Sequence, residues 1–217
     1  MSNFKDDFTK QDPWRILRIM SEFVEGFEQL SDIKKAVSVF GSSRVKPQSK
    51  YYRLAEKTAR IFSKAGFAII TGAGPGIMEA ANKGARAVRG QSIGLNILTP
   101  IQQKPNRYLN RLLEFRYFFC RRVMFAKYSQ AYLIFPGGYG TMDEFMEAVT
   151  LIQTARMKPR PVILFDKEYW QGLLDWLRFF SLKNKMIDTK DLRIFNLVQT
   201  PQEALEIITH YGRRKRV

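Results

Sequence analysis

The sequence is poor in the residues that build disulfide frameworks and metal sites, and it lacks long apolar runs. It has one cysteine and one histidine in 217 residues, and no apolar run approaches the ~20 residues that a membrane helix needs. A single cysteine, Cys120, excludes an internal disulfide framework and is typical of a reducing compartment. His210 lies far in sequence from every glycine-rich turn, and no zinc-ligand spacing occurs. We therefore expect no histidine catalysis, no metal and no cofactor.

The charge is strongly of one sign, with 36 Lys and Arg against 20 Asp and Glu and a formal net charge of +16. Such a balance favours anionic partners, and nucleic acid or a membrane surface has to be considered. The charges are scattered except at Arg213–Arg216, and no aromatic RNA-binding signature accompanies them. We interpret them as a basic surface that attracts a small phosphorylated ligand. Met1–Lys10 lacks the apolar run of a signal peptide, so we expect a cytoplasmic protein.

The chain has no internal repeat and no obvious linker, which predicts one domain over residues 1–217. We divide it into an N-terminal helical extension (1–35), an α/β core (36–211) and a basic tail (212–217). In the extension, Asp12 is a suitable helix cap and Pro13 a suitable first residue. An apolar stripe follows at helical spacing: Ile16, Met20, Phe23, Phe27 and Leu30. Either the body of the protein or another subunit has to cover this stripe.

Short apolar runs alternate with amphipathic segments from Ala36 onward. The predicted strands are Ala36–Phe40, Phe67–Thr71, Ser92–Ile97, Ala131–Phe135, Val162–Phe165 and Phe195–Val198, with Leu112–Phe115 as a weaker candidate. The predicted helices are Tyr51–Ala65, Ile77–Val88, Phe118–Lys127, Met142–Ala155 and Tyr169–Leu182, and Thr200–Glu203 is the capping box of a last one. This alternation predicts a doubly wound, Rossmann-like parallel sheet covered by helices on both faces. Ligands bind such sheets at the carboxyl ends of the strands.

Two glycine-rich turns follow the first two predicted strands. The first turn, Phe40–Arg44, offers small residues and the hydroxyl of Ser42. The second, Thr71–Glu79, brings Gly74, Gly76 and free helix amides toward an anion. Its spacing is not G-x-G-x-x-G, and no acidic residue follows at the distance of a ribose-binding one, which excludes a dinucleotide site. No Gly-Lys-Ser/Thr follows, which excludes a P-loop. Glu79 either faces the ligand or is a first-turn acid favoured by the helix dipole.

The third turn is Phe135–Glu144, and it gives the strongest signal. Three glycines in four positions, Gly137, Gly138 and Gly140, follow a buried strand and open a helix. Such a nest of amides suits a terminal monophosphate, which needs donors but no lysine or magnesium. Thr141 either donates a hydrogen bond to this phosphate or forms a capping box with Glu144.

These residues resemble a known family. Pro136–Glu144 fits the P-G-G-x-G-T-x-x-E motif of the LOG family, cytokinin riboside 5′-monophosphate phosphoribohydrolases that were long labelled lysine decarboxylases. Thr71–Ala80 resembles the other glycine-rich turn of that family, with Ala73 where a third glycine is usual. The resemblance implies a catalytic pair, Arg121 and Glu144. Arg122 is the alternative arginine if the alignment with the family is shifted by one residue. It departs from the family at Phe119-Cys120, where a His-Glu pair is common.

The resemblance implies hydrolysis of the bond between base and ribose in a nucleoside 5′-monophosphate, by a dimer or larger homo-oligomer with its site near the subunit interface. A rival interpretation is a carrier, because the molybdenum cofactor carriers resemble this fold and hold a phosphorylated pterin without turnover. A pyridoxal-phosphate decarboxylase is disfavoured, since nothing around Lys83 or Lys127 indicates a Schiff base. Cys120 beside two arginines is either a nucleophile with a depressed pKa or, as we favour, a buried small residue.

Overall fold

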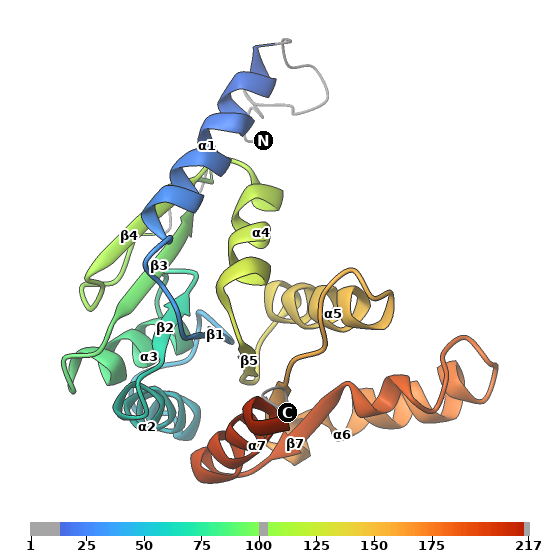
Figure 1. The fold of residues 1–217 in the computed structure, drawn as a ribbon. Helices are drawn as coiled ribbons and strands as arrows, with labels where there is room; N and C mark the ends of the chain where they lie inside the picture. Colours follow the sequence, from blue (N-terminus) through green and yellow to red (C-terminus); the bar gives the residue numbers. More distant parts are fainter. Residues whose placement is uncertain (1–13, 100–103, 215–217) are drawn as a thin grey trace, which may run out of the picture.

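The computed structural model describes residues 14–99 and 104–214, and within them seven parallel strands form one sheet (Figure 1). Its order is β4-β3-β2-β1-β5-β6-β7. The strands are β1 (Ala36–Phe40), β2 (Ala68–Thr71), β3 (Ser92–Ile97), β4 (Arg111–Phe115), β5 (Ala131–Ile134), β6 (Val162–Phe165) and β7 (Phe195–Val198). All seven predicted strands are confirmed, including the weaker candidate, which is β4. The doubly wound parallel fold is confirmed as well.

Helices cover both faces of this sheet. They are α1 (Arg15–Gln29), α2 (Lys50–Lys64), α3 (Ile77–Arg86), α4 (Phe118–Tyr128), α5 (Tyr139–Gln153), α6 (Lys167–Trp176) and α7 (Pro201–Arg214). A π-helical turn, Leu177–Leu182, prolongs α6, and a 3₁₀ turn, Asp191–Arg193, precedes β7. One core layer packs against α1, α4 and α5, and the other packs against α2, α3 and α7 (Figure 1). Among the described residues, no helix combines the length and apolarity of a membrane span.

Strand β1 illustrates why these sequences form a sheet buried on both sides. Val37 and Val39 pack into the layer of α2 and α3, whereas Ala36 and Phe40 pack into the layer of α1 and α4. This alternation follows the two-residue period of a strand. The five residues of β1 are all buried, as expected for the central strand of a parallel sheet.

The connections run in opposite directions from β1. The chain passes outward through β2, β3 and β4 on one side, and then returns to pair β5 with β1 before it continues to β6 and β7. The crevice between β1 and β5 is thus the topological switch point, where open α/β sheets bind ligands. The three glycine-rich turns follow β1, β2 and β5, which are neighbours in the sheet.

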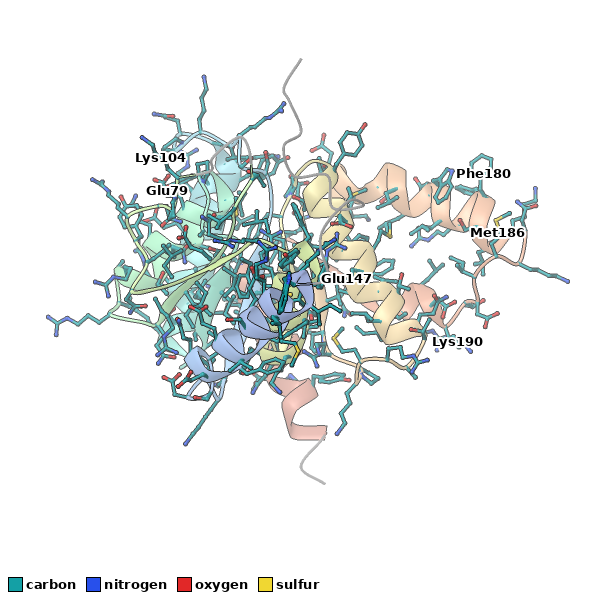
Figure 2. All side chains as sticks on the ribbon, turned by 90° about the horizontal axis from the view of Figure 1, so that it is seen from above. Glu79, Lys104, Glu147, Phe180, Met186 and Lys190 are labelled. Carbon is teal, nitrogen blue, oxygen red and sulfur yellow. The ribbon has the colours of Figure 1, made fainter. Side chains whose placement is uncertain are left out.

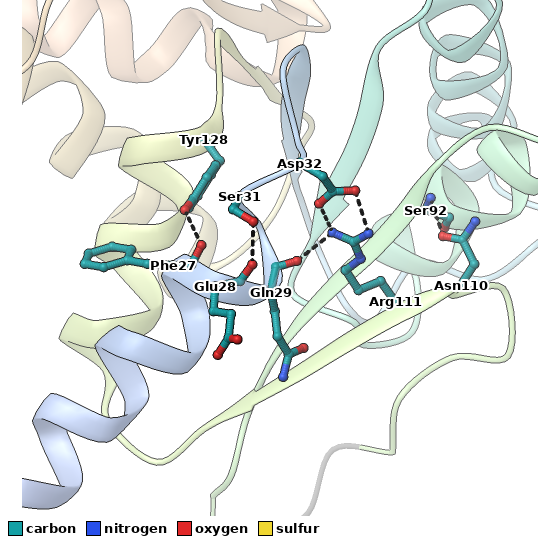
Figure 3. A network of polar contacts seen from close by, with 9 residues as sticks. All are labelled: Phe27, Glu28, Gln29, Ser31, Asp32, Ser92, Asn110, Arg111 and Tyr128. Atoms are coloured by element: carbon teal, nitrogen blue, oxygen red, sulfur yellow. Dashed lines mark hydrogen bonds and ion pairs between the residues drawn. The ribbon is translucent and has the colours of Figure 1, made fainter.

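Helix α1 is fixed to the body at its C-terminal end (Figure 3). The guanidinium of Arg111, on β4, donates to both carboxylate oxygens of Asp32 at 2.5 and 2.9 Å and to the carbonyl oxygen of Gln29 at 2.6 Å. The hydroxyl of Tyr128, on α4, donates to the carbonyl oxygen of Phe27 at 3.1 Å. The helix is therefore held against both the sheet edge and α4.

The predicted apolar stripe of this helix is only partly covered. Leu30 is buried and Phe23 packs against the core, but Ile16 and Met20 are 63% and 56% exposed. The predicted cap Asp12 and first residue Pro13 lie outside the described residues, as do Lys215 and Arg216 of the basic tail. The capping box of the last helix is confirmed, because Thr200 accepts a hydrogen bond from the amide of Glu203 and Glu203 accepts one from the amide of Gln199.

Two helix glycines give a matched test of the packing. A Cβ atom on Gly84 of α3 would overlap the carbonyl oxygen of Glu56 on α2, whereas one on Gly172 of α6 would meet no atom within 4 Å. Gly84→Ala should lower the free energy of unfolding by about 1–3 kcal/mol through overpacking. Gly172→Ala should raise it by about 0.5–1 kcal/mol because alanine favours the helix. Urea unfolding of both variants measures the two effects, and a neutral Gly84→Ala would contradict the close approach of α2 and α3.

Candidate functional site

The three glycine-rich turns meet at the backbone of Ser42. The amide of Ser42 donates to the carbonyl oxygen of Pro136 at 3.0 Å, and its own carbonyl oxygen accepts from the amide of Ile77 at 3.0 Å. A Cβ atom on Gly137 would lie 2.8 Å from the Ser42 nitrogen, and one on Gly76 would overlap the Ser42 carbonyl oxygen. The close approach of the turns therefore requires glycine at both positions.

The second turn contains two left-handed residues. Gly76, the N-cap residue of α3, has φ 67°. Ala73 has φ 68° and is fully buried, although this conformation favours glycine and costs an L residue about 1–2 kcal/mol. Ala73 occupies the position where the resemblance expects a third glycine, and its backbone adopts a conformation that glycine favours.

A buried polar network holds the second turn in this conformation. The side-chain amide of Asn106 donates to the carbonyl oxygens of Ala73 (2.9 Å) and Gly74 (3.1 Å) and contacts the side-chain oxygen of Asn82 (3.0 Å). The hydroxyl of Thr71 accepts from the amide of Ala73 at 3.0 Å and donates to Asn82 at 2.7 Å. Sequence reasoning missed Asn82 and Asn106, because no local pattern links either side chain to the turn.

The third turn opens α5 earlier than predicted. The helix begins at Tyr139 and not at Met142, and Gly138 is its N-cap residue. Thr141 thus lies inside the first helical turn, so the capping box with Glu144 is wrong. The first amides of a helix have no partner within it, and Gly138, Tyr139 and Gly140 are exposed. This end of α5 therefore presents backbone donors to the solvent.

Thr141 and Gly137 form the inner side of the same turn. Thr141 is buried, and a Cβ atom on Gly137 would overlap its hydroxyl oxygen. On Gly138 or Gly140, by contrast, a Cβ atom would meet nothing within 4 Å. One glycine of the turn is thus required by internal packing, whereas the other two border open space.

Arg121 and Glu144 form a buried ion pair beside the turns. Nη2 of Arg121, on α4, lies 3.3 Å from Oε1 of Glu144, on α5, and their side chains are 11% and 8% exposed. Nη1 of Arg121 is 3.7 Å from the position that a Cβ atom on Gly72 would take. The guanidinium therefore bridges the helix that opens at the third turn and the start of the second turn. Its Nε atom is buried and has no hydrogen-bond partner among the described residues.

Burial dominates the electrostatics of this pair. It raises the pKa of Glu144 to about 7, although the charge of Arg121 acts to lower it. The hydration that the carboxylate loses on burial outweighs its attraction to this one guanidinium. Burial also lowers the pKa of Arg121, which nevertheless stays protonated. Near neutral pH, the Glu144 carboxyl can therefore exist in both protonation states.

Arg122 occupies a different position from Arg121. It contacts Asp143, and its Nε lies 3.6 Å from a carboxylate oxygen of Glu147. Arg122, Glu144 and Glu147 also line a small cavity between α4 and α5, of about 10 Å³, which is barely enough space for one water molecule. The sequence left open which of the two arginines pairs with Glu144, and in the structure it is Arg121.

Several other candidates make contacts of their own. Glu79, in the first turn of α3, accepts a hydrogen bond from the hydroxyl of Tyr52 at 3.1 Å. In Figure 2 it lies on the same side of the molecule as Lys104, whereas Glu147 lies nearer the centre. The Ser42 hydroxyl accepts from the amide of Arg44 at 3.1 Å, so it forms a local turn.

The residues of the rejected alternatives also have structural partners. Lys83 pairs with Glu56 at 3.1 Å, and Lys127 lies over the ring of Phe27. Cys120 is buried, and burial raises the pKa of its thiol to about 12. The interpretation of Cys120 as a nucleophile with a depressed pKa is therefore wrong.

The sheet order and the turns together define a Rossmann-like α/β protein whose glycine-rich turns meet at the switch point of the sheet. The model of the family described as "Possible lysine decarboxylase" matches residues 78–208 of the chain. This range is more than half of the chain and includes Arg121 and the third turn, so the chain belongs to this family. The resemblance to the LOG proteins is confirmed.

Curated relatives carry the phosphoribohydrolase name. The cytokinin riboside 5′-monophosphate phosphoribohydrolase of Rhodococcoides fascians is 27% identical over 152 residues, which cover 69% of this chain and 77% of the relative. A probable enzyme of the same name from Oryza sativa subsp. japonica, LOGL6, is 30% identical over 95 residues, 43% of this chain and 37% of the relative. These similarities support a nucleotide phosphoribohydrolase at the level of the family.

Solved structures share the fold. The X-ray structure of TM1055 has a TM-score of 0.60 and 24% identity and covers 82% of this chain and 99% of its own. The molybdenum cofactor binding protein of Rippkaea orientalis has the same TM-score with 18% identity and covers 83% and 99%. Identities this low show a common fold only, so the activity has to be inferred from the site.

The buried Glu144 carboxyl makes stability depend on pH. Its pKa is about 7 in the folded protein against an ordinary 4.5, so folding favours the protonated form. The associated stability is fully present below pH 4.5 and is lost as pH rises toward 7, up to about 3 kcal/mol. Glu144→Gln, which cannot ionise, should lose less stability than the wild type between pH 5 and pH 8. Urea unfolding at both pH values measures this, and equal losses would contradict the burial of the carboxyl.

Proposed function

We propose that the protein hydrolyses the N-glycosidic bond of a nucleoside 5′-monophosphate, AMP or an N6-modified AMP of the cytokinin type, to the free base and ribose 5-phosphate. The observation that carries the proposal is the buried Arg121–Glu144 pair, which joins the helix that opens at the third turn to Gly72 of the second turn. Membership of the family and the names of its curated relatives support the same activity.

The phosphate would bind at the third turn. Helix N-termini attract anions through unpaired amides and the helix dipole. The exposed backbone of Gly138 and Gly140 leaves room for a phosphate, and the second turn, with Gly74 and Gly76, would close the cleft from β2. This arrangement needs no metal to hold a monophosphate.

Glu144 would act on the ribose. Glycosidic cleavage passes through an oxocarbenium-like state, which an ionised carboxylate stabilises. The same carboxylate can take a proton from the attacking water and give it to the departing base, so that the base leaves as a neutral molecule and the sugar gains a hydroxyl. A pKa of about 7 suits this exchange, because it lies near the working pH.

Arg121 would orient the carboxylate. A guanidinium stays charged, so it is a poor acid but a good clamp for Glu144 or for phosphate. Its position between Glu144 and Gly72 and its unpartnered buried Nε favour such a clamp. Arg122, which pairs with Asp143 and Glu147, would lie at the edge of the site and would not contact the reacting bond.

The test is incubation of the purified protein with a panel of nucleoside monophosphates, with free base scored by chromatography. We expect base release from at least one adenine nucleotide, and loss of at least about 1,000-fold in kcat for Glu144→Gln, with ribose 5-phosphate still bound. Asp143→Asn is the matched control, since this neighbouring carboxylate is 48% exposed and pairs with Arg122. It should retain activity within about threefold.

Two results would contradict the proposal. Normal hydrolysis by Glu144→Gln would make the carboxyl a structural group only. Binding of nucleotides without release of any base would favour the carrier alternative, whose solved representatives share this fold.

A further inference from the structure

The carboxylate of Glu22, on α1, caps the start of helix α4. Its Oε1 accepts a hydrogen bond from the amide of Arg116 at 2.8 Å, and its Oε2 accepts one from the amide of Tyr117 at 3.3 Å. Tyr117 is the N-cap residue of α4 and makes no side-chain capping bond of its own. In a capping box, a Glu or Gln at position N3 binds the N-cap amide, but N3 of α4 is Cys120. A glutamate of the N-terminal extension takes this role instead, from the helix alongside (Figure 1).

The start of α4 carries positive charge without an acidic residue of its own. Arg121 and Arg122 follow Phe118–Cys120, and the first turn contains no Asp or Glu. The positive end of the helix dipole disfavours cations at this place and favours anions. Burial lowers the pKa of Arg121, and the neighbouring charge of Arg122 acts in the same direction. The carboxylate of Glu22 supplies a negative charge at this end of the helix, where it offsets the dipole.

A chain of contacts links Glu22 to the ion pair of the site. The amide of Tyr117 is bound by Glu22, and the carbonyl oxygen of Tyr117 accepts a hydrogen bond from the amide of Arg121 at 3.3 Å. The guanidinium of Arg121 lies 5.2 Å from the ring centre of Phe118, the first residue of α4. The same guanidinium pairs with Glu144. The place of this guanidinium therefore depends on where the first turn of α4 is set.

The helix that carries Glu22 is itself fixed. Hydrogen bonds hold its C-terminal end to β4 and to α4. Gly26, one turn after Glu22, packs directly on Met124 of α4, because a Cβ atom at Gly26 would lie 2.7 Å from the methionine methyl carbon. A rigid support of this kind is what holds functional groups in a precise geometry.

We propose that Glu22 is a positioning residue of the reaction: it fixes the first turn of α4 so that the guanidinium of Arg121 meets the carboxylate of Glu144. Its effect on turnover rests on the proposed function, whereas the ion pair that it positions is present without substrate. The N-terminal extension is then a working part of the site, although it contributes no group to the reacting bond.

The first test is the rate of base release by two variants. Glu22→Ala removes both acceptors, and Glu22→Gln keeps one acceptor without the charge. Glu22→Ala should lower kcat by at least about 10-fold, since misplaced catalytic groups cost up to about 100-fold. Glu22→Gln should lose less. KM should change by less than about threefold, because the proposed phosphate-binding turns open α3 and α5 and not α4.

The second test is the pKa of Glu144, measured by carbon-13 NMR of protein labelled at the glutamate carboxyls, with Glu144→Gln to assign the signal. The charged and titratable side chains around this carboxyl are Arg121 and Arg122 on α4, Asp143 and Glu147 on α5, and Tyr132 on β5. In Glu22→Ala a displaced Arg121 lowers the pKa of Glu144 less, so this pKa should rise. The expected rise is at least about 0.5, part of the effect of about 1–3 that a close opposite charge has.

Glu25→Ala is the matched control. Glu25 has the same charge on the same helix, but it is exposed and accepts only from the side-chain amide of Gln29. It should leave kcat and the pKa of Glu144 unchanged. If Glu22→Ala does not fold, the same comparison is made with Glu22→Gln.

Two results would overturn the proposal. A wild-type kcat and an unchanged pKa of Glu144 in Glu22→Ala would mean that Glu22 only anchors α1. A fall in this pKa would indicate the direct loss of a negative charge and not a displaced arginine. If the wild type releases no base from any nucleotide, the proposed function fails, and the NMR titration still decides whether Glu22 positions Arg121.

Discussion

The backbone of Ser42 is the contact on which the arrangement of the glycine-rich turns depends. It hydrogen-bonds on one side to the turn after β5 and on the other to the start of α3. Both contacts arise because β1 lies between β2 and β5, at the point where the order of the sheet reverses. The doubly wound topology thus brings two helix N-termini, and the partial positive charge of each, to one place. This is the place where we propose that the phosphate binds.

The site also contains a charge pair in a dry environment. Arg121 and Glu144 come from different helices, α4 and α5, and meet beside the same turns. Burying such a pair is costly, and a purely structural role would be served as well by apolar residues. The cost is visible in the raised pKa of Glu144. We interpret the pair as a functional group kept at the expense of stability, next to a nest of backbone donors.

Much of the fold could be predicted from the sequence, because buried strands and amphipathic helices have distinct periods. The start of α5 could not, since Tyr139 and Gly140 are weak helix formers that nevertheless form its first turn. The contact between Arg121 and Glu144 needed the family motif, as the residues are 23 apart in sequence. The role of Asn106 behind the second turn had no local signal at all, because its partners come from the turn after β2 and from α3.

The most direct test of the account is a crystal structure of Glu144→Gln with a nucleoside 5′-monophosphate. We expect the phosphate on the amides of Gly138–Gly140, with residue 144 facing the bond between ribose and base. The phosphate should also lie within reach of the second turn, on the side of Gly76. A phosphate bound away from both turns, or a ribose that points away from residue 144, would contradict the claim that the two helix N-termini and the buried carboxyl form one site.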